Sequence, residues 1–271
     1  MKYYIYVSLF FLINLSCNIL NRPRIEGNAV EILQYNDKTL MNYKAQGLAI
    51  MLSDTLDDYD LSVIKSKKNP RTQLEETFRI LSELSASKKI TLLKVDNDKL
   101  PNEFILLKNT EFMDISDLKH LNFNKVFSQL STLPNLKIII SSRNHYGDLP
   151  DSICKISSLE GIFMHYSEIT TIPECLAQLP NLNSFGLAYG NNNMDNIASV
   201  LSKSTTLDSL HIAGSNLTKL PEAVSNIKNL KYIDLFENDI KTLPCSLANR
   251  NISIHIEENR NYKKPKCLEE K

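Results

Sequence analysis

The chain has 271 residues, with 31 Lys and Arg balanced by 31 Asp and Glu, so its formal net charge is zero. This balance excludes the strongly basic surface with which nucleic-acid-binding proteins neutralise phosphates. Hydrophobic residues make up 42% and charged residues 23% of the chain, the composition of an ordinary globular protein. Seven Gly and ten Pro exclude a collagen-like or linker-like polymer, and no apolar run is long enough to predict a conventional spanning helix.

The N-terminus has the pattern of an export signal. Lys2 supplies a positive charge, and residues 5–15 are almost wholly apolar, which is too short to span a bilayer but fits a signal-peptide core. The following Ser16 and Cys17 resemble the lipobox of bacterial lipoproteins, although Asn14 stands where an aliphatic residue is usual. The resemblance implies that Cys17 is lipidated and becomes the mature N-terminus. Ordinary signal cleavage and an uncleaved leader are the alternatives, and all three export the chain.

Residues 18–89 differ from the rest of the chain in their sequence pattern, which predicts helices. One helix is expected over about 37–56, where apolar residues recur at helical spacing. A second is expected to begin at Asn69–Pro70, since Pro is favoured at the first helical position. We expect these helices to cap the domain that follows, with an independent functional domain as the alternative. This stretch contains no Cys or His, which argues against catalysis there.

A repeat of about 23 residues fills the rest of the chain. It is clearest from Leu230 to Pro244, where apolar residues stand at positions 1, 4, 6, 11 and 14, Asn at position 9 and Pro at position 15. The pattern recurs in steps of 23 residues, with two extra residues around Asn191–Asn193. The sequence therefore predicts eight units, which begin near residues 90, 113, 136, 159, 182, 207, 230 and 251.

This spacing resembles the short bacterial leucine-rich repeat, LxxLxLxxNxLxxLP, over residues 90–259. The resemblance implies an α/β repeat solenoid, a horseshoe whose parallel sheet lines the concave face. Positions 4 and 6 should point inward, because side chains alternate along a strand. Asn at position 9 should satisfy backbone groups of the turn. Ser167 and Ser215 could bond similarly, whereas Gly190 and Leu121 could not, so the side-chain ladder is expected to be broken at those two positions.

The predicted domain organisation follows from these patterns. It comprises a signal peptide with a lipobox-like Cys17 at 1–17, a helical N-terminal cap at 18–89, leucine-rich repeats at 90–259 and a C-terminal tail at 260–271.

The phase of the repeat places positions 3, 5, 7 and 8 on the concave face. The first two units are charged and mixed there, although Ile115 stands at position 3 of the second. The middle units carry large apolar and aromatic residues, with Ile138 at position 3, and the last units are acidic. Such side chains on a solvated sheet face indicate a recognition surface. The alternative is that they pack on one another as cross-strand pairs. The predicted protein-binding residues are Ile140, Phe163, His165, Tyr166, Tyr189, His211, Tyr232 and Phe236.

His211, Asp234 and His255 fall in one column on three adjacent predicted strands. Collinear side chains converge poorly on a single ion, so a metal site is not expected. A hydrogen-bonded ladder of the three side chains, whose charge varies with pH, is the preferred interpretation.

Four cysteines follow the lipobox, and their spacing does not fit a zinc site. Export permits disulfides but does not require them. Cys245 and Cys267 are a possible disulfide that closes the C-terminal end of the solenoid. Cys154 and Cys175 lie on the return segments of consecutive units and are either two thiols or a disulfide.

These patterns predict an exported, lipid-anchored bacterial protein that recognises a protein or peptide partner on its concave face. Asn18, in place of Asp after Cys17, implies by the lipoprotein resemblance an outer-membrane or cell-surface location if the cell has an outer membrane. A structural scaffold of the cell envelope without a concave-face ligand is the alternative. No catalytic Cys–His or Ser–His–Asp arrangement is identifiable, so neither enzymatic activity nor a cofactor is expected.

Overall fold

The computed structural model describes the C-terminal two thirds of the chain with side chains and four earlier strands by their backbone. The described residues are 31–35, 38–43, 48–53, 89–95, 99–100, 105, 107–118, 121–247, 250–265 and 267. The predicted signal peptide, the lipobox-like Cys17 and the helix predicted from Asn69 lie outside these residues.

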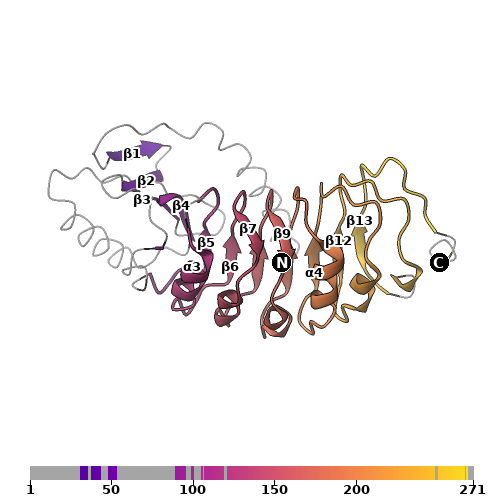
Figure 1. Ribbon diagram of the computed structural model, residues 1–271. Coiled ribbons are helices and arrows are strands. Elements are labelled where there is room, and N and C mark those ends of the chain that lie inside the picture. Colours follow the sequence, from indigo (N-terminus) through magenta and orange to yellow (C-terminus); the bar gives the residue numbers. More distant parts are fainter. Residues whose placement is uncertain are drawn as a thin grey trace.

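The described part is a one-layer sheet backed by short helices (Figure 1). The strands are β1 (Glu31–Tyr35), β2 (Lys38–Tyr43), β3 (Leu48–Ser53), β4 (Lys89–Val95), β5 (Phe112–Asp114), β6 (Ile138–Ile140), β7 (His145–Asp148), β8 (Gly161–Phe163), β9 (Glu168–Thr171), β10 (Ser184–Gly186), β11 (Ser209–His211), β12 (Tyr232–Asp234) and β13 (Ser253–His255). The described helices are α3 (Phe123–Leu130) and α4 (Met194–Leu201), with the 3₁₀ helices η3 (Asp151–Lys155), η4 (Glu174–Gln178), η5 (Glu222–Asn226) and η6 (Cys245–Leu247).

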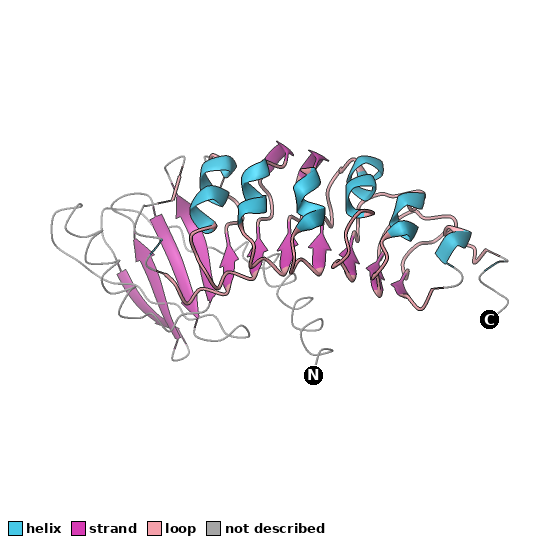
Figure 2. Cartoon of the chain, turned by 90° about the horizontal axis from the view of Figure 1, so that it is seen from below, coloured by secondary structure: helices cyan, strands magenta, loops and turns pink. Residues whose placement is uncertain are grey.

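The main sheet has eleven strands in the order β1-β2-β3-β4-β5-β6-β8-β10-β11-β12-β13, and β7 pairs with β9 in a small second sheet. From β4 to β13 all neighbours are parallel. Figure 2 shows the helices along one side of the solenoid and the strands of the main sheet along the other. The fold is therefore an α/β repeat solenoid with a parallel sheet on its concave face, as the sequence predicts.

Inward-facing side chains of successive units form one continuous core. At position 4 the paired residues Ile139, Ile162, Phe185, Leu210 and Ile233 are all 0% exposed. Full burial of each such side chain contributes about 2 kcal/mol, and each one also packs on the units before and after it. One unit alone cannot bury these side chains, so the stacking of units stabilises the fold.

The N-terminal end of the sheet corrects one prediction. The helix expected over about 37–56 is wrong, because β2 and β3 form antiparallel strands there. β3 also pairs antiparallel with β4, from Ser53 opposite Lys89 to Leu48 opposite Val95. The first strand of a parallel sheet has an unpaired edge, and pairing satisfies its N–H and C=O groups. These long-range hydrogen bonds outweigh the helical spacing of the apolar residues.

The register of the first two units also differs from the prediction. Phe112 pairs with Ile138, so the second unit begins at residue 110 and not near 113. Lys89 pairs with Phe112, which moves the first unit by the same three residues. Ile115, expected on the concave face, is therefore in the core at 0% exposure, and Phe112 takes the outward place.

The length of each unit follows the length of its helix. Units whose helices η3, η4 and η5 have five residues are 23 residues long, measured between paired strand residues. The unit with α3 is 26 residues long, the unit with α4 is 25, and the unit with the three-residue η6 is 21. Extra residues are thus absorbed on the convex side, and the strands stay in register. The 26-residue unit is the reason why a strict 23-residue step misplaces the first two units.

Each unit turns inward after its strand through a residue in the left-handed region. This residue is at position 8, with φ between 53° and 61° in Asp117, Arg143, Tyr166, Tyr189, Gly214, Glu237 and Glu258. Left-handed backbone costs a non-glycine residue roughly 1 kcal/mol or more. Its recurrence in seven successive units gives all of these side chains the same direction along one rim of the concave face.

A ladder of Asn side chains joins the turns. Asn238 Oδ1 accepts hydrogen bonds from the N–H groups of Ser215 and Leu217, both at 3.0 Å, and its Nδ2 donates to the Ile212 carbonyl at 2.9 Å. Asn144 and Asn259 make equivalent bonds to their preceding units.

The ladder continues at one of the two positions where it was expected to be broken. In the unit with Gly190, Asn192 accepts from the Ile169 N–H at 2.8 Å and donates to the Leu187 carbonyl at 3.2 Å. The two extra residues of this unit thus bring a substitute Asn to the turn. The other predicted break moves with the register from Leu121 to Leu118, which has no side-chain hydrogen-bonding group, while its own N–H is bonded by Asn144 of the next unit.

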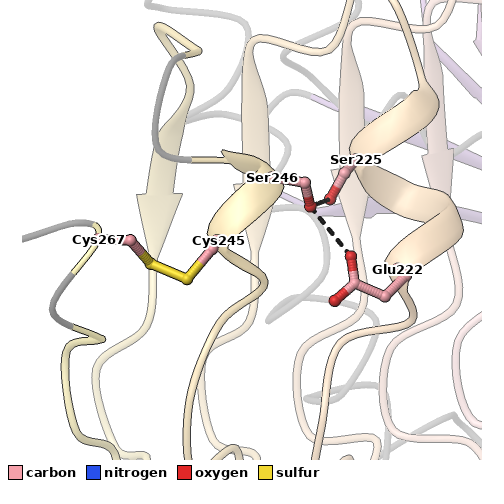
Figure 3. The surroundings of a disulfide bond; sticks show 5 residues. All are labelled: Glu222, Ser225, Cys245, Ser246 and Cys267. Carbon is pink, nitrogen blue, oxygen red and sulfur yellow. Dashed lines mark hydrogen bonds between the residues drawn. A yellow bond between two sulfur atoms is a disulfide. The ribbon is translucent and has the colours of Figure 1, made fainter.

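Two disulfides lie on the convex side. Cys154 and Cys175 join η3 to η4 with a Cα–Cα distance of 5.9 Å, so this pair is a disulfide in the structure and not two thiols. Cys245 and Cys267 join η6 to the C-terminal tail at 5.8 Å (Figure 3). Beside it, Ser246 Oγ bonds to Glu222 Oε2 at 3.0 Å in the preceding unit. Closing loops of this length stabilises a fold by about 3 kcal/mol on the chain-entropy account.

The ladder role of Asn192 leads to a stability prediction. Asn192→Ala should lower the free energy of unfolding by about 1–3 kcal/mol, because it leaves the Ile169 N–H and the Leu187 carbonyl without their partner. Asn191→Ala, at the exposed neighbouring position, is the matched control and should change it by less than about 0.5 kcal/mol. Urea unfolding of both variants measures the difference. Equal effects of the two substitutions would contradict the ladder role.

Candidate functional site

The concave face contains an apolar cluster of its own. Phe112, Ile140 and Phe163, from neighbouring strands β5, β6 and β8, are 2%, 3% and 1% exposed and contact one another, with Ile138 packed beside them. The cluster is separate from the main core, which lies on the inner side of the same strands. It arises because the side chains at positions 3 and 5 point to the concave face, where each lies next to the side chain at the same position of the neighbouring strand.

Small residues on the next strand make room for the aromatic rings. A Cβ at Gly186 would lie 2.5 Å from Phe163 Cδ1 and 3.2 Å from His165 Cε1, so both rings lean over β10. Three of the predicted binding residues, Ile140, Phe163 and His165, are only 1–3% exposed. Their packing fits the alternative that these side chains contact one another, and they form the floor of the concave face.

His165 is a neutral histidine of defined tautomer. Its Nδ1 accepts a hydrogen bond of 2.9 Å from the Ala188 N–H, so the ring proton is on Nε2. Burial lowers the pKa of His165 to about 3, and the neighbouring His211 lowers it further. The side chain therefore carries no charge near neutral pH.

A row of position-8 side chains forms the more accessible part of the face, and we call it the tyrosine row. At its start Arg143 Nη2 and Asp117 Oδ2 are 2.6 Å apart in a bidentate ion pair. The Arg143 guanidinium lies over the Tyr166 ring, 6.0 Å from its centroid. The rings of Tyr166 and Tyr189 stack with centroids 5.0 Å apart, and Tyr189 Oη donates to Glu237 Oε2 at 3.2 Å.

Gly214 is the reason why the row can extend so far. A Cβ at this position would overlap the Tyr189 ring, so the ring lies flat over the Gly214 backbone and reaches Glu237 two units away. Gly214 also occupies the left-handed turn position with φ of 58°. The tyrosine row therefore spans the face from Asp117 to Glu237 without interruption.

The remaining predicted residues lie at the C-terminal side of this face. The His211 ring lies between Phe163 and Tyr232, at centroid distances of 5.6 and 5.4 Å. Burial lowers the pKa of His211 to about 4, partly opposed by the negative charge of Asp234. Phe236 stacks on the His255 ring at 5.2 Å.

In the predicted His–Asp–His column, a hydrogen bond joins Asp234 Oδ1 and His255 Nδ1 at 2.9 Å. The other ring nitrogen of His255 faces Glu257 Oε2 at 3.1 Å. Among the described residues, no three His, Cys, Asp or Glu side chains form a group able to hold a metal ion.

Charge is distributed unevenly over the face. At position 2, along one edge, Lys137 lies 3.2 Å from Glu111 and 3.9 Å from Glu160, so one positive charge partly compensates two carboxylates. The last two units present four carboxylates at positions 5, 7 and 8 but no Lys or Arg there. Those carboxylates are Asp234, Glu237, Glu257 and Glu258.

The structure adds two residues to the predicted site. Phe112 was missed because the predicted register of the second unit was three residues off and did not place it at an outward position. Arg143 follows the phase of the repeat, and its ion pair with Asp117 and contact with Tyr166 need the left-handed turn at position 8.

No described helix combines the length and apolar character needed to cross a bilayer.

No protein-family model matches the chain, and no curated protein matches it in sequence. Among solved structures, the leucine-rich repeat domain of the type III effector XopL aligns with a TM-score of 0.50 and 18% identity, over 75% of this chain and 81% of that domain. The Leptospira interrogans leucine-rich-repeat protein LIC12759 aligns with a TM-score of 0.36 and 21% identity, over 62% of this chain and 51% of that one.

The plant peptide hormone receptor RGFR1, solved in complex with RGF2, aligns with a TM-score of 0.43 and 16% identity, over 65% of this chain and 29% of that one. At these identities the likeness concerns the fold alone. Together with the register of the strands, the Asn ladder and the inward turns, the alignment with the XopL domain shows that this chain has the leucine-rich-repeat fold.

Proposed function

We propose that this chain is an exported, lipid-anchored protein that holds a protein or peptide partner on its concave face. The observation that carries the proposal is the tyrosine row, in which stacked Tyr166 and Tyr189 lie between an Arg–Asp ion pair and Glu237. Tyr and Arg are enriched at the energetic centres of protein interfaces, since they combine large contact areas with polar ends. Tyr166 is 38% exposed, and Tyr232 and Phe236 are half-buried beside the row.

The floor and the row have different parts in this proposal. Ile140, Phe163 and His165 pack beneath and give the face a rigid shape. Tyr166, Tyr189, Tyr232 and Phe236 make the contacts with the partner. Aromatic side chains held in place by their neighbours lose little conformational entropy on binding. A held row is therefore better suited to recognition than free side chains.

Two features support export. Disulfides persist in oxidising compartments and are rare in the reducing cytosol, and both cysteine pairs of the repeat domain lie within bonding distance. The apolar stretch at 5–15 and the following Ser16–Cys17 supply the signal and the lipidation site. In this proposal the acyl chains on Cys17 hold the protein at the cell envelope, in an outer membrane where one is present.

The lipid anchor can be tested by substitution. Cys17→Ser should abolish labelling of the protein with radioactive palmitate and move it from the membrane to the soluble envelope fraction, because the acylated thiol is lost. Ser16→Ala, which keeps a small residue before the Cys, is the control and should leave both properties unchanged. Labelling that persists in Cys17→Ser would contradict the anchor.

The binding face can be tested with the full chain, expressed for export, purified and immobilised. The variant Tyr166→Ala/Tyr189→Ala/Phe236→Ala should bind the partner at least about 30-fold more weakly, the loss expected when central interface residues are truncated. The convex variant Lys155→Ala/Gln178→Ala changes exposed residues of η3 and η4 and should bind like the parent. Quantitative mass spectrometry of proteins captured from envelope, matrix and serum preparations measures the difference.

The controls decide the interpretation of this capture experiment. Circular dichroism must show that each variant is folded. Equal capture by parent, concave variant and convex variant would contradict the concave site and favour the scaffold role.

A further inference from the structure

The concave face carries a charge that the chain as a whole does not. Among the described outward positions 3, 5, 7 and 8 from Phe112 to Glu258 there are six carboxylates and one cation, Arg143, so these positions have a net charge of −5 with histidines neutral, whereas the whole chain has a formal net charge of zero. Four of the six carboxylates belong to the last two units, and we call them the acidic end. They are Asp234, Glu237, Glu257 and Glu258.

The positive charges closest to the acidic end do not neutralise it. Lys231, on the neighbouring edge of the sheet, lies with its Nζ 3.2 Å from Asp208 Oδ2 and is already paired. The two ring nitrogens of His255 contact Asp234 and Glu257 at 2.9 and 3.1 Å. Even when it is protonated, His255 therefore offsets only one of the four negative charges.

Glu237 and Glu258 are the two carboxylates of the acidic end that lie on the rim. They occupy position 8 of adjacent units, whose backbones are joined by the hydrogen bond from the Glu237 N–H to the Glu257 carbonyl at 3.1 Å. Both are exposed, and among the described residues neither has an ion pair. Like charges at the same position of neighbouring strands, about 4.8 Å apart, are unfavourable in the free protein. A partner of opposite charge would relieve this repulsion.

The tyrosine row shows which cation fits beside it. At its N-terminal end the Arg143 guanidinium lies over the Tyr166 ring and is paired with Asp117. At its C-terminal end Tyr189 Oη donates to Glu237 Oε2, so a ring and a carboxylate again lie together. No Lys or Arg stands at the described outward positions of the units from Leu207 onward. The second arrangement thus has the ring and the carboxylate of the first and lacks its cation.

We propose that the partner held on the concave face is a basic protein segment, whose Lys or Arg side chains lie over the acidic end while its apolar side chains contact the tyrosine row. This proposal rests on the proposed function of the face and names the chemical class of the partner. The same field repels the phosphates of nucleic acids and anionic lipids, so it favours a protein over either of them.

The test uses linear peptides selected from a random phage-displayed library on the purified full chain. A selected peptide is assigned to the concave face if Tyr166→Ala/Tyr189→Ala abolishes its binding, and such peptides should carry a net positive charge. The acidic-end variant Glu237→Gln/Glu257→Gln/Glu258→Gln should bind them about tenfold more weakly in low-salt buffer, because several exposed charge pairs are lost. Gln keeps an oxygen that can accept from Tyr189.

A control variant with the same change in net charge makes the result specific. Glu168→Gln/Glu174→Gln/Glu222→Gln alters exposed residues of β9, η4 and η5, outside the concave face, and should bind like the parent. Peptides whose Lys and Arg are replaced by Gln should bind the parent and the acidic-end variant alike, so a double-mutant cycle gives a coupling between the two sets of charges. The affinity of the parent should also fall more steeply with salt than that of the acidic-end variant.

The outcomes separate the two proposals. If no peptide depends on the tyrosine row, the proposed function fails and the basic partner with it. If peptides depend on the row but are neutral or acidic, or bind the acidic-end variant like the parent, the basic partner fails and the proposed function stands. Equal losses in the acidic-end and control variants would also overturn the basic partner, because the effect would then come from the net charge of the whole chain.

Discussion

The structure depends on the burial of inward side chains that each unit shares with its neighbours. A three-residue strand gives a unit only one or two core side chains, and these are buried only if the next strand lies in register. This constraint explains why units of 21 to 26 residues occur in one sheet without a bulge between the parallel strands of the repeats. Variation in length is confined to the convex side, where a 3₁₀ helix of three or five residues or an α-helix of eight can connect the same two points.

The same constraint organises the concave face. Because every unit turns inward at position 8 through a left-handed residue, outward side chains of successive units line up in rows. The rows permit contacts over long sequence distances, as between Tyr189 and Glu237, which are 48 residues apart. Gly186 and Gly214 then decide which large rings can lie flat over a neighbouring strand. A face built in this way has a packed floor and a more accessible aromatic row, and the proposed function assigns a different part to each.

Much of the fold could be predicted from the sequence, because the same residue types recur at the same positions of successive units. The units from Leu136 onward have the expected register, since their apolar positions recur together, with Asn or Ser at position 9 and Pro at position 15 in all of them except the unit from Leu182. The predicted register of the first two units was wrong, because α3 adds three residues to a unit whose own repeat pattern is weak. The helix predicted over the segment of β2 and β3 was wrong, because β3 pairs with β4 and β2 pairs with β3. The pairing of β3 with β4 joins residues dozens of positions apart, which the local spacing of apolar residues cannot reveal.

The candidate site was predictable in outline only. Outward positions could be assigned from the phase, but the burial of Phe163 depends on Gly186 one unit later, and the reach of Tyr189 depends on Gly214. Asn192 shows the same limit, because its ladder role follows from an insertion that shifts it by two residues into the turn. In each case the decisive contact joins neighbouring units, whereas the sequence pattern describes each unit separately.

The most direct test of the account is a disulfide map of the protein isolated from the cell envelope, with free thiols blocked before digestion. The account predicts peptides that link Cys154 to Cys175 and Cys245 to Cys267. This result would support both the register of consecutive units and export to an oxidising compartment. Four free thiols, or a link between Cys154 and Cys245, would contradict it.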